Sequence, residues 1–518
     1  MKDETQQPLE LLPPPTPRRR TDAVLLLGFT AVALLLRLPN IQESLWLDEL
    51  HTAWVVQGGL EEMPRRAAIG NHSPIYFLLP WLSVQVFGLN ELALRLPSLI
   101  AGTALVPGVY LVARRLSGSP LAAFVAASLA TFDSDFLYFS SEARQYACVQ
   151  LVALGQVAAL WRVLQGGGWR WRTVWILLTA LLFYLHYTAV LLVVAEVVFV
   201  VALIPFRAWQ AGRLKNFAMD VSAAALLMLP AAWHLLEIAD RRVNWQQFIT
   251  SPDSLASWQL FPLAAYLLVP VLLTYGYLFL QKLTGVARPL QGTSPKLVPI
   301  LFCLCWLLVP LAVAYFTTRF EIAALWMHRY VMASAAAVMV LASLLAAFPK
   351  QLPLRIVFGG LTLLAAIGWA GPHWSLIEFG VPRPPRSENW RDAVALIGGD
   401  AEAGEWPVLL CPVLIEADGL PENPEDKPLR EYCLLPVRSI YPVEPQRIAI
   451  PLPTQRPGNI SDADFARIGS PRGVWIITRG RPENATYRVN SILKSLRRAG
   501  MKPQKTTTHT FGGVRVVR

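Results

Sequence analysis

Two adjacent carboxylates, Asp48 and Glu49, follow the first long apolar segment of the chain, with Trp46 before them and His51 after them. Ionisable side chains this close to a membrane boundary carry a desolvation cost, so they are candidates for a functional site. A carboxylate in this position can act as a general base, which contributes about 10²–10⁴-fold to a reaction rate. The sequence therefore predicts a catalytic loop with Asp48 as base and Glu49 as a second catalytic acid.

A second polar group, Glu142, Arg144 and Tyr146, follows a later apolar segment and is predicted to face the same, outer side of the membrane. Outside the cell there is no nucleotide sugar, so a sugar transferase there needs a lipid-linked donor, whose departing phosphate arginines can stabilise. Glu142 is predicted to be catalytic. The residues predicted to bind the donor or its phosphate are Arg144, Tyr146, His72, Arg329, Tyr330 and His186.

Each of these residues also has a structural interpretation. Asp48 could cap a helix that starts at Glu49, which is worth about 1 kcal/mol, and Glu49 could be an ordinary first-turn acid. His72 could begin a helix whose first residue is Pro74. His186 and Arg329 could be interfacial anchors. A cap alone does not explain the second acidic motif on the same face, so we favour function for Asp48.

The composition indicates an integral membrane protein. Hydrophobic residues make up 54% of the 518 residues and charged residues 16%, and the mean hydropathy is +0.41. The net charge of +11 comes largely from basic residues in short loops between apolar blocks, which is an orientation signal. No basic segment with interleaved aromatics is present in the soluble part, so nucleic-acid binding is excluded.

The apolar blocks predict a polytopic α-helical protein of about eleven spans, with a disordered cytoplasmic tail over residues 1–20 and a multi-pass domain over residues 21–371. Residues 74–88 are too short for a span of about 20 residues, so we expect an interfacial helix in the first outer loop, residues 39–91. Arg114 and Arg115 then fall in the cytoplasm. The predicted spans are 21–38, 92–113, 120–138, a fourth ending at 164, 171–184, 189–205, 217–236, 260–280, 297–316, 330–348 and 356–370.

The C-terminal part has a different composition. Residues 372–386 are predicted to be a linker and residues 387–518 a small α/β domain, on the extracytoplasmic side beside the first loop by the same alternation. Helices are expected over 388–398 and 487–499, strands over 408–413 and 474–478, and a hairpin around Gly512 and Gly513. Cys411 and Cys433 could pair in an oxidising compartment, and Cys148, Cys303 and Cys305 fall in spans.

An ordered set of motifs resembles the dolichyl-phosphate-mannose protein mannosyltransferases and their bacterial relatives, including the lipid A aminoarabinose transferases. The set comprises Leu47-Asp48-Glu49, Asn71-His72-Ser73-Pro74-Ile75-Tyr76, the stretch from Phe87 to Ser98, Ala113-Arg114-Arg115-Leu116-Ser117-Gly118, Ser141-Glu142-Ala143-Arg144-Gln145-Tyr146 and Arg329-Tyr330.

This resemblance implies a C-type glycosyltransferase fold that uses a polyprenyl-phosphate sugar. It implies that Asp48 is the essential first-loop acid and Glu49 its companion, and that Arg144 lies near the donor phosphate. Asn71-His72-Ser73-Pro74 stands where the aminoarabinose transferases have Glu-Lys-Pro-Pro. One carboxylate and one permanent charge are therefore missing, which argues against aminoarabinose as the sugar and lipid A as the acceptor.

The favoured hypothesis is an inverting glycosyltransferase of the cell's inner membrane that moves a sugar from polyprenyl phosphate to a hydroxyl of a protein, lipid or glycan. It requires that the acid pair and the Glu-x-Arg-x-Tyr motif converge on one outer cavity. The alternative is a lipid or solute transporter, which needs ionisable residues near the middle of its spans. The sequence offers few such residues, and Glu196 and Asp220 are the exceptions. An inactive scaffold is disfavoured by intact Asp48 and Glu142. The carboxylates could hold a divalent ion, but no ligand spacing establishes one.

Overall fold

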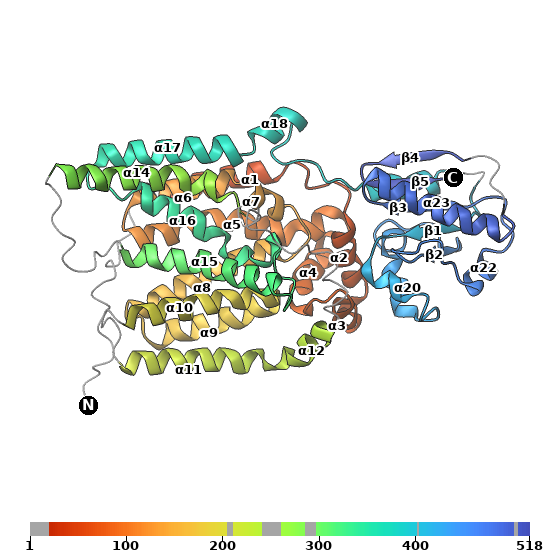
Figure 1. The fold of residues 1–518 in the computed structure, drawn as a ribbon, viewed down its shortest axis with the longest axis horizontal. Coiled ribbons are helices and arrows are strands. Elements are labelled where there is room, and N and C mark those ends of the chain that lie inside the picture. Colours follow the sequence, from red (N-terminus) through yellow and green to blue (C-terminus); the bar gives the residue numbers. More distant parts are fainter. Residues whose placement is uncertain (1–19, 205–210, 241–260, 285–296, 401–402, 502–505) are drawn as a thin grey trace. The chain divides into compact units, whose positions relative to one another are not determined.

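The computed structural model describes residues 20–204, 211–240, 261–284, 297–400, 403–501 and 506–518 (Figure 1). The predicted N-terminal tail lies outside these residues except for Arg20. The chain divides into two compact units. The first, residues 1–39 and 98–383, is here called the helical unit, and the second, residues 40–97 and 384–518, the loop–sheet unit.

The helical unit consists of helices that run roughly parallel to one another (Figure 1). Local capping sets some of their ends: Ser119 caps α6 ahead of Pro120, and Asp133 caps α7. The α-helices are α1 Arg20–Arg37, α5 Glu91–Ser117, α6 Pro120–Phe132, α7 Ser134–Ser140, α8 Tyr146–Leu164, α9 Gly168–Leu185, α10 Val190–Leu203, α11 Ala211–Met228, α12 Ala232–Asp240, α14 Leu263–Leu283, α15 Leu297–Arg319, α16 Ala335–Ala346, α17 Leu352–Ala370 and α18 His373–Phe379. The first turns of α5 belong to the loop–sheet unit.

Short 3-10 turns join several of these helices. They are η2 Tyr187–Ala189, η4 Leu229–Ala231, η6 His328–Tyr330 and η7 Met332–Ser334. Each of the eleven segments predicted to cross the membrane is helical over most of its described residues. The described residues of these segments that are not helical are Leu38, Asp133, Phe261, Pro262, Val331, Ala347 and Phe348. Six described helices are long and apolar enough to cross, or seven if α6 and α7, bent by 60°, form one span. This confirms a multi-pass helical membrane protein, and the count of eleven stays a prediction.

Glu196 and Asp220, the two mid-span acids that the sequence analysis singled out, have structural partners. Glu196 Oε2 accepts hydrogen bonds from Gln156 Nε2 at 3.0 Å and Trp175 Nε1 at 3.1 Å. Asp220 forms an ion pair with Arg172, 2.7 Å between Oδ1 and Nη2. Buried polar groups need such partners because an unsatisfied group in an apolar interior is costly.

The loop–sheet unit combines the first loop with the C-terminal domain. Its loop contains α2 Leu47–Gln57, α3 Gly59–Ile69, η1 Pro74–Phe77 and α4 Leu78–Phe87. The C-terminal domain contains α19 Trp390–Gly398, β1 Val408–Cys411, η8 Ile415–Gly419, α20 Lys427–Cys433, α21 Leu435–Arg438, β2 Ala449–Pro451, α22 Asp462–Ile468, β3 Trp475–Arg479, α23 Pro482–Arg498, β4 Thr508–Phe511 and β5 Val514–Val517.

The five strands form one mixed sheet of order β2-β1-β3-β5-β4. β1 pairs in parallel with β2 and β3, and β5 pairs antiparallel with β3 and β4. Apolar residues of α23, including Val489, Ile492 and Leu496, pack with Leu409 and Ile476 in the core. The predicted helices, strands and terminal hairpin are present, and β2, which has only 3 residues, was not predicted.

Two sequence expectations differ from the structure. The first outer loop was grouped with the membrane domain, whereas its residues 40–97 belong to the same compact unit as the C-terminal domain. Cys411 and Cys433 do not pair: both are buried free thiols. Burial raises the pKa of Cys411 to about 11, so it behaves as a small core residue. Cys148, Cys303 and Cys305 are buried and free, as core residues should be.

Candidate functional site

The acid loop begins helix α2. The helix starts at Leu47 with Trp46 as its N-cap, and Glu49, three residues after the cap, accepts a hydrogen bond from Trp46 N at 3.3 Å. Asp48 is therefore not the cap, and the capping interpretation applies to Glu49 instead. Asp48 is half-buried in the first helical turn, where a carboxylate interacts favourably with the positive end of the helix dipole.

Glu49 is fully buried and paired. Its two oxygens accept hydrogen bonds from Arg95 Nε at 2.7 Å and Arg95 Nη2 at 2.6 Å, and both side chains are 0% exposed. Arg386 Nε lies 3.5 Å from Glu49 Oε2. A two-pronged guanidinium–carboxylate contact fixes the orientation of both groups. Glu49 is thus a structural anchor of the loop, whatever else it does.

Arg95 also fixes the chain that leads into α2. Its Nη1 donates to the carbonyl oxygens of Ile41 at 2.9 Å and Glu43 at 2.7 Å, and its Nη2 donates to that of Ser44 at 3.3 Å. One buried guanidinium on α5 therefore holds both the approach to Asp48 and the carboxylate that follows it.

The C-terminal domain holds the same segment through three further contacts. Glu388 Oε2 accepts from Leu47 N at 3.1 Å, and Tyr441 Oη accepts from Leu45 N at 3.0 Å. Arg391 N donates to Ser44 Oγ at 3.1 Å. These residues, with Arg95, are here called the loop clamp: Arg95, Glu388, Arg391 and Tyr441. All three contacts from the C-terminal domain are made to residues within four positions of Asp48. The loop clamp therefore fixes the backbone position of Asp48.

The two histidines of the first loop lie near each other. His51 is buried, its Nε2 lies 3.2 Å from Arg66 O, and its ring meets Tyr432 edge-on at 5.6 Å. A side chain at Gly70 would collide with this ring, since an added Cβ would lie 2.4 Å from His51 Cε1. His51 thus packs as a core residue. His72 is half-buried, with its ring centre 5.8 Å from that of His51.

The second predicted motif lies in the helical unit, in the bend between α7 and α8. Glu142, Arg144 and Tyr146 are all buried. Arg144 N donates to Glu142 O at 2.7 Å, and Arg144 O accepts from Ser98 Oγ at 2.8 Å. The bend is therefore tied to α5, and this fixes the backbone from which the Arg144 side chain projects.

Several predicted donor-binding residues meet around His186. Its ring centre lies 5.9 Å from that of Tyr146 and 5.6 Å from that of Tyr330, and the guanidinium of Arg329 lies 5.7 Å from the Tyr330 ring centre. Burial, and then the positive charges of Arg329 and Arg144, lower the pKa of His186 to about 3. The structure thus brings together two arginines, two tyrosines and a neutral imidazole.

Thr188, in η2, links two parts of this group. Its hydroxyl lies 2.8 Å from His186 Nδ1 and donates to Tyr330 O at 2.8 Å. Arg144, Tyr146, His186, Arg329 and Tyr330 are here called the arginine–aromatic cluster. The charges of Arg144 and Arg329 both act on His186. Two guanidinium groups around one ring favour the binding of an anion, because the anion stabilises both positive charges.

An acidic group beside this cluster was missed by sequence reasoning. Asp133 Oδ1 accepts from Phe136 N at 2.7 Å, and Tyr266 donates to Asp133 Oδ2. His328 Nε2 lies 3.3 Å from Asp135 Oδ2. Phe139 connects the two groups, since its ring centre lies 5.1 Å from that of Tyr146 and 5.7 Å from that of His328. Asp133 and Asp135 lie inside the predicted span 120–138, and two acids within one apolar span were the available signal.

The predicted site residues are divided between the two units. Asp48, Glu49 and His72 belong to the loop–sheet unit, and Glu142 with the arginine–aromatic cluster belongs to the helical unit. Convergence of the two motifs on one cavity therefore stays a prediction. Among the described residues, no group of three or more His, Cys, Asp or Glu is arranged to hold a metal ion.

The sequence matches a family model over part of its length. Residues 71–234 match the model of the dolichyl-phosphate-mannose-protein mannosyltransferases. The matched range includes Glu142, Arg144, Tyr146 and His186, and it begins after Asp48. A sequence search among curated proteins finds no significant match. The predicted resemblance is thus confirmed over these residues.

Solved structures resemble the chain over most of its length. ArnT from Cupriavidus metallidurans bound to undecaprenyl phosphate aligns with a TM-score of 0.54 and 14% identity over 96% of this chain and 98% of that one. Its apo form has a TM-score of 0.50, also at 14% identity and with the same coverage. The oligosaccharyltransferase AglB from Archaeoglobus fulgidus, in complex with an inhibitory peptide and a dolichol-phosphate, has a TM-score of 0.48 and 13% identity over 89% of this chain and 69% of that one. The ArnT matches confirm the predicted fold.

Proposed function

We propose that this protein is a membrane glycosyltransferase that moves a sugar from a polyprenyl-phosphate donor to a hydroxyl acceptor on the extracytoplasmic face. The observation that carries the proposal is the arginine–aromatic cluster. In it, the half-buried His186 ring lies beside the rings of Tyr146 and Tyr330, and the charges of Arg144 and Arg329 both act on it. A fold shared with a protein that binds undecaprenyl phosphate supports it. So does the mannosyltransferase match, which includes Arg144.

The reaction is a single displacement at the anomeric carbon. Asp48 removes the proton from the acceptor hydroxyl, whose oxygen then forms the new bond to that carbon. The bond between the anomeric carbon and the phosphate oxygen breaks, and its electron pair leaves with the polyprenyl phosphate. Arg144 and Arg329 stabilise the charge that develops there. Glu142 and His72 position the donor or the acceptor, and the configuration inverts.

Asp48 suits the role of base better than its neighbour. Glu49 is 0% exposed, and both of its carboxylate oxygens accept hydrogen bonds from Arg95. These bonds fix the orientation of the Glu49 side chain. Asp48 is half-buried in the same helical turn. The Glu49–Arg95 pair is therefore proposed to position Asp48 and not to exchange protons with the acceptor.

The transporter alternative has less support. A transporter is expected to have ionisable residues near the middle of its spans, and the sequence offers few of them. The two singled out are bound to partners within the fold: Glu196 to Trp175, and Asp220 to Arg172. Inward-facing acids that serve a transport path need access to a substrate or ion. Their hydrogen bonds instead join neighbouring helices, α9 with α10 and α9 with α11.

The test is transfer of labelled sugar from a polyprenyl phosphate in membrane vesicles. The variant Asp48→Asn should abolish transfer, whereas Asp462→Asn, at an exposed position of α22, should leave it unchanged. Retained transfer in Asp48→Asn removes this residue as base.

Arg144→Gln should raise the KM for the lipid donor at least tenfold, and an unchanged KM would contradict its role at the phosphate. Chemical identification of the glycan missing from a deletion strain names the acceptor.

A further inference from the structure

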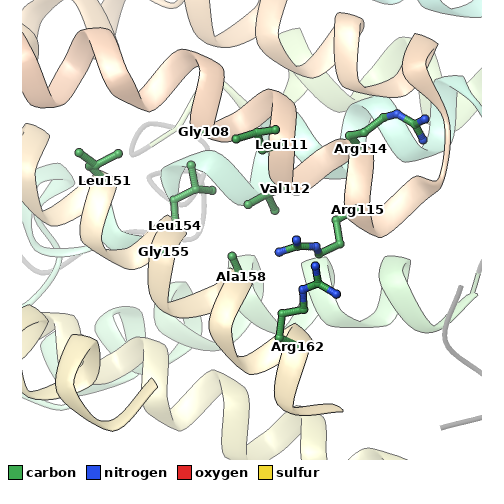
Figure 2. A pocket seen from close by; sticks show the side chains of 10 residues that line it. All are labelled: Gly108, Leu111, Val112, Arg114, Arg115, Leu151, Leu154, Gly155, Ala158 and Arg162. Carbon is green, nitrogen blue, oxygen red and sulfur yellow. The ribbon is translucent and has the colours of Figure 1, made fainter. Parts of the chain in front are cut away.

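A second candidate binding site lies in the helical unit, between α5 and α8. It is a half-open cavity of about 320 Å³ (Figure 2). Tyr146 of the arginine–aromatic cluster begins α8, and Arg162 at this cavity stands 16 residues later. At 1.5 Å per residue the two are about 24 Å apart along the helix. The cavity is therefore at the end of α8 away from that cluster.

The cavity has an apolar wall and a cationic end. An added Cβ at Gly108 would lie 2.8 Å from Leu154 Cδ2, so the small residue is what lets α5 and α8 approach here. The wall is formed by Gly108, Leu111, Val112, Leu151, Leu154, Gly155 and Ala158, and the cationic end by Arg114, Arg115 and Arg162. None of these ten described lining residues is acidic.

The three arginines are not equivalent. Arg114 donates to Gly118 O at 2.6 Å and its Nε lies 3.7 Å from Asp22 Oδ1, and its side chain points away from the other two (Figure 2). Arg115 and Arg162 extend toward each other from α5 and α8 (Figure 2). Arg162 also lies 5.6 Å from the ring centre of Trp171. Two guanidinium groups that face each other across the cavity form a cationic end that attracts an anion.

We propose that this cavity binds an anionic membrane phospholipid, with the headgroup phosphate between Arg115 and Arg162 and the start of an acyl chain along the apolar wall. Basic pockets between transmembrane helices on the cytoplasmic side are the kind of site that takes anionic headgroups. Charge alternation along the chain predicts that both arginines face the cytoplasm. A volume of about 320 Å³ accommodates a headgroup and its first methylene groups, and the rest of the chain stays in the bilayer.

The site is independent of the proposed function. Polyprenyl phosphate shares the phosphate and the apolar chain, but the candidate donor site is at the other end of α8. A phospholipid is present at high concentration at the membrane surface, and here it joins α5 to α8. Its expected effect is therefore a more stable helical unit.

The experiment uses the full-length protein in zwitterionic phosphatidylcholine nanodiscs, with the Tm measured as phosphatidylglycerol is added. Phosphatidylglycerol should raise the Tm of the wild type and of the control Arg170→Gln, whose side chain is exposed nearby on α9. The double variant Arg115→Gln/Arg162→Gln should need at least tenfold more of this lipid for the same rise. An equal rise in the double variant would overturn the proposal.

Two further arms keep the test decisive. Ala158→Phe fills the cavity while both arginines remain, and it should weaken the phosphatidylglycerol effect too; an unchanged effect would contradict binding in the cavity. Undecaprenyl phosphate is added in parallel at equal concentration. If it raises the Tm more than phosphatidylglycerol, and the double variant abolishes that rise, the occupant is the carrier lipid and the proposal is wrong. Sugar transfer is not used as a readout, so failure here leaves the proposed function untouched.

Discussion

At the residue scale, the two neighbouring acids of the first loop differ in what surrounds them. Glu49 is enclosed by Arg95 and Arg386 with no exposed surface, whereas Asp48, one residue earlier, is half-buried. A helix turns by about 100° per residue, so adjacent side chains point in different directions. Adjacent acids in the sequence can therefore have unrelated roles.

Replacement of Glu49 tests its structural role. Glu49→Gln leaves the Arg95 charge buried without its counter-ion, and we expect it to lower the free energy of unfolding by about 3–5 kcal/mol. Glu62→Gln removes a solvent-exposed partner of Arg65 and should have no measurable effect. Thermal unfolding of the purified variants is the measurement. Equal Tm values for Glu49→Gln and the wild type would show that the pair is not an anchor.

His186 gives a pH prediction. Its pKa in the folded protein, about 3, lies below the ordinary value of about 6.5. The causes are desolvation of the ring and then the positive charges of Arg329 and Arg144; the rings of Tyr146 and Tyr330 are its neighbours. Below pH 6.5 the unfolded chain takes up a proton that the folded protein does not, so stability falls as the pH falls from 6.5 toward 3.

His186→Gln should therefore lose less Tm than the wild type between pH 7 and pH 5. His509→Gln, at an exposed site on β4, should follow the wild type. If His186→Gln also follows it, the imidazole is not held neutral. A ring that stays neutral does not titrate near pH 6.5. The pH profiles of sugar transfer by the wild type and by His186→Gln should therefore have the same shape around that pH.

At the element scale, the segment before α2 is held from two directions by the loop clamp. Arg95 comes from α5, and Glu388, Arg391 and Tyr441 come from the C-terminal domain. Tyr441 Oη also donates to Glu91 Oε1 at 2.8 Å. Burial, with the Glu91 carboxylate nearby, raises the pKa of Tyr441 to about 12, so the hydroxyl keeps its proton. We therefore expect the C-terminal domain, which has no catalytic motif of its own, to position Asp48.

Tyr441→Phe tests this positioning role. The substitution leaves Leu45 N without its partner, at a cost of about 1–3 kcal/mol, and lets the loop move. We expect kcat for sugar transfer to fall about tenfold with little change in the KM for the lipid donor. Tyr487→Phe, at a position 63% exposed on α23, is the matched control. An unchanged kcat in a folded Tyr441→Phe protein would contradict the role of the clamp.

At the scale of the whole molecule, the chain forms two compact units that are not contiguous in sequence. Residues 40–97 leave the first helix, join the C-terminal domain, and return through α5 to the helical unit. If Asp48 acts outside the cell, the whole loop–sheet unit must be outside as well. The sidedness of the C-terminus is therefore a test of the proposed function.

Reporter fusions check this orientation. Alkaline phosphatase, which is active only outside the cytoplasm, should be active when fused after Arg518. A fluorescent protein that matures only in the cytoplasm should be bright when fused before Met1. Fusion of each reporter to the opposite end is the internal control. An active phosphatase at the N-terminus together with an inactive one at the C-terminus would invert the topology and end the proposal of extracytoplasmic transfer.

Sequence patterns determined much of this protein. Apolar blocks of helical length predicted the membrane class because a helix satisfies its own backbone in lipid, and strand and turn signals predicted most of the C-terminal sheet. The order of polar motifs identified Asp48, Glu142 and Arg144 as candidates. These features are local, so neighbouring residues are enough to specify them.

Only the tertiary structure decided which residues meet. His186 contacts Tyr146 and Tyr330 across a gap of 40 residues on one side and 144 on the other, and Glu49 finds Arg95 46 residues away. The clamp joins Leu45 to Tyr441, 396 residues apart. Hydrophobic patterning does not encode such pairings, because a buried polar contact depends on the packing of whole elements and on distances that no single segment contains.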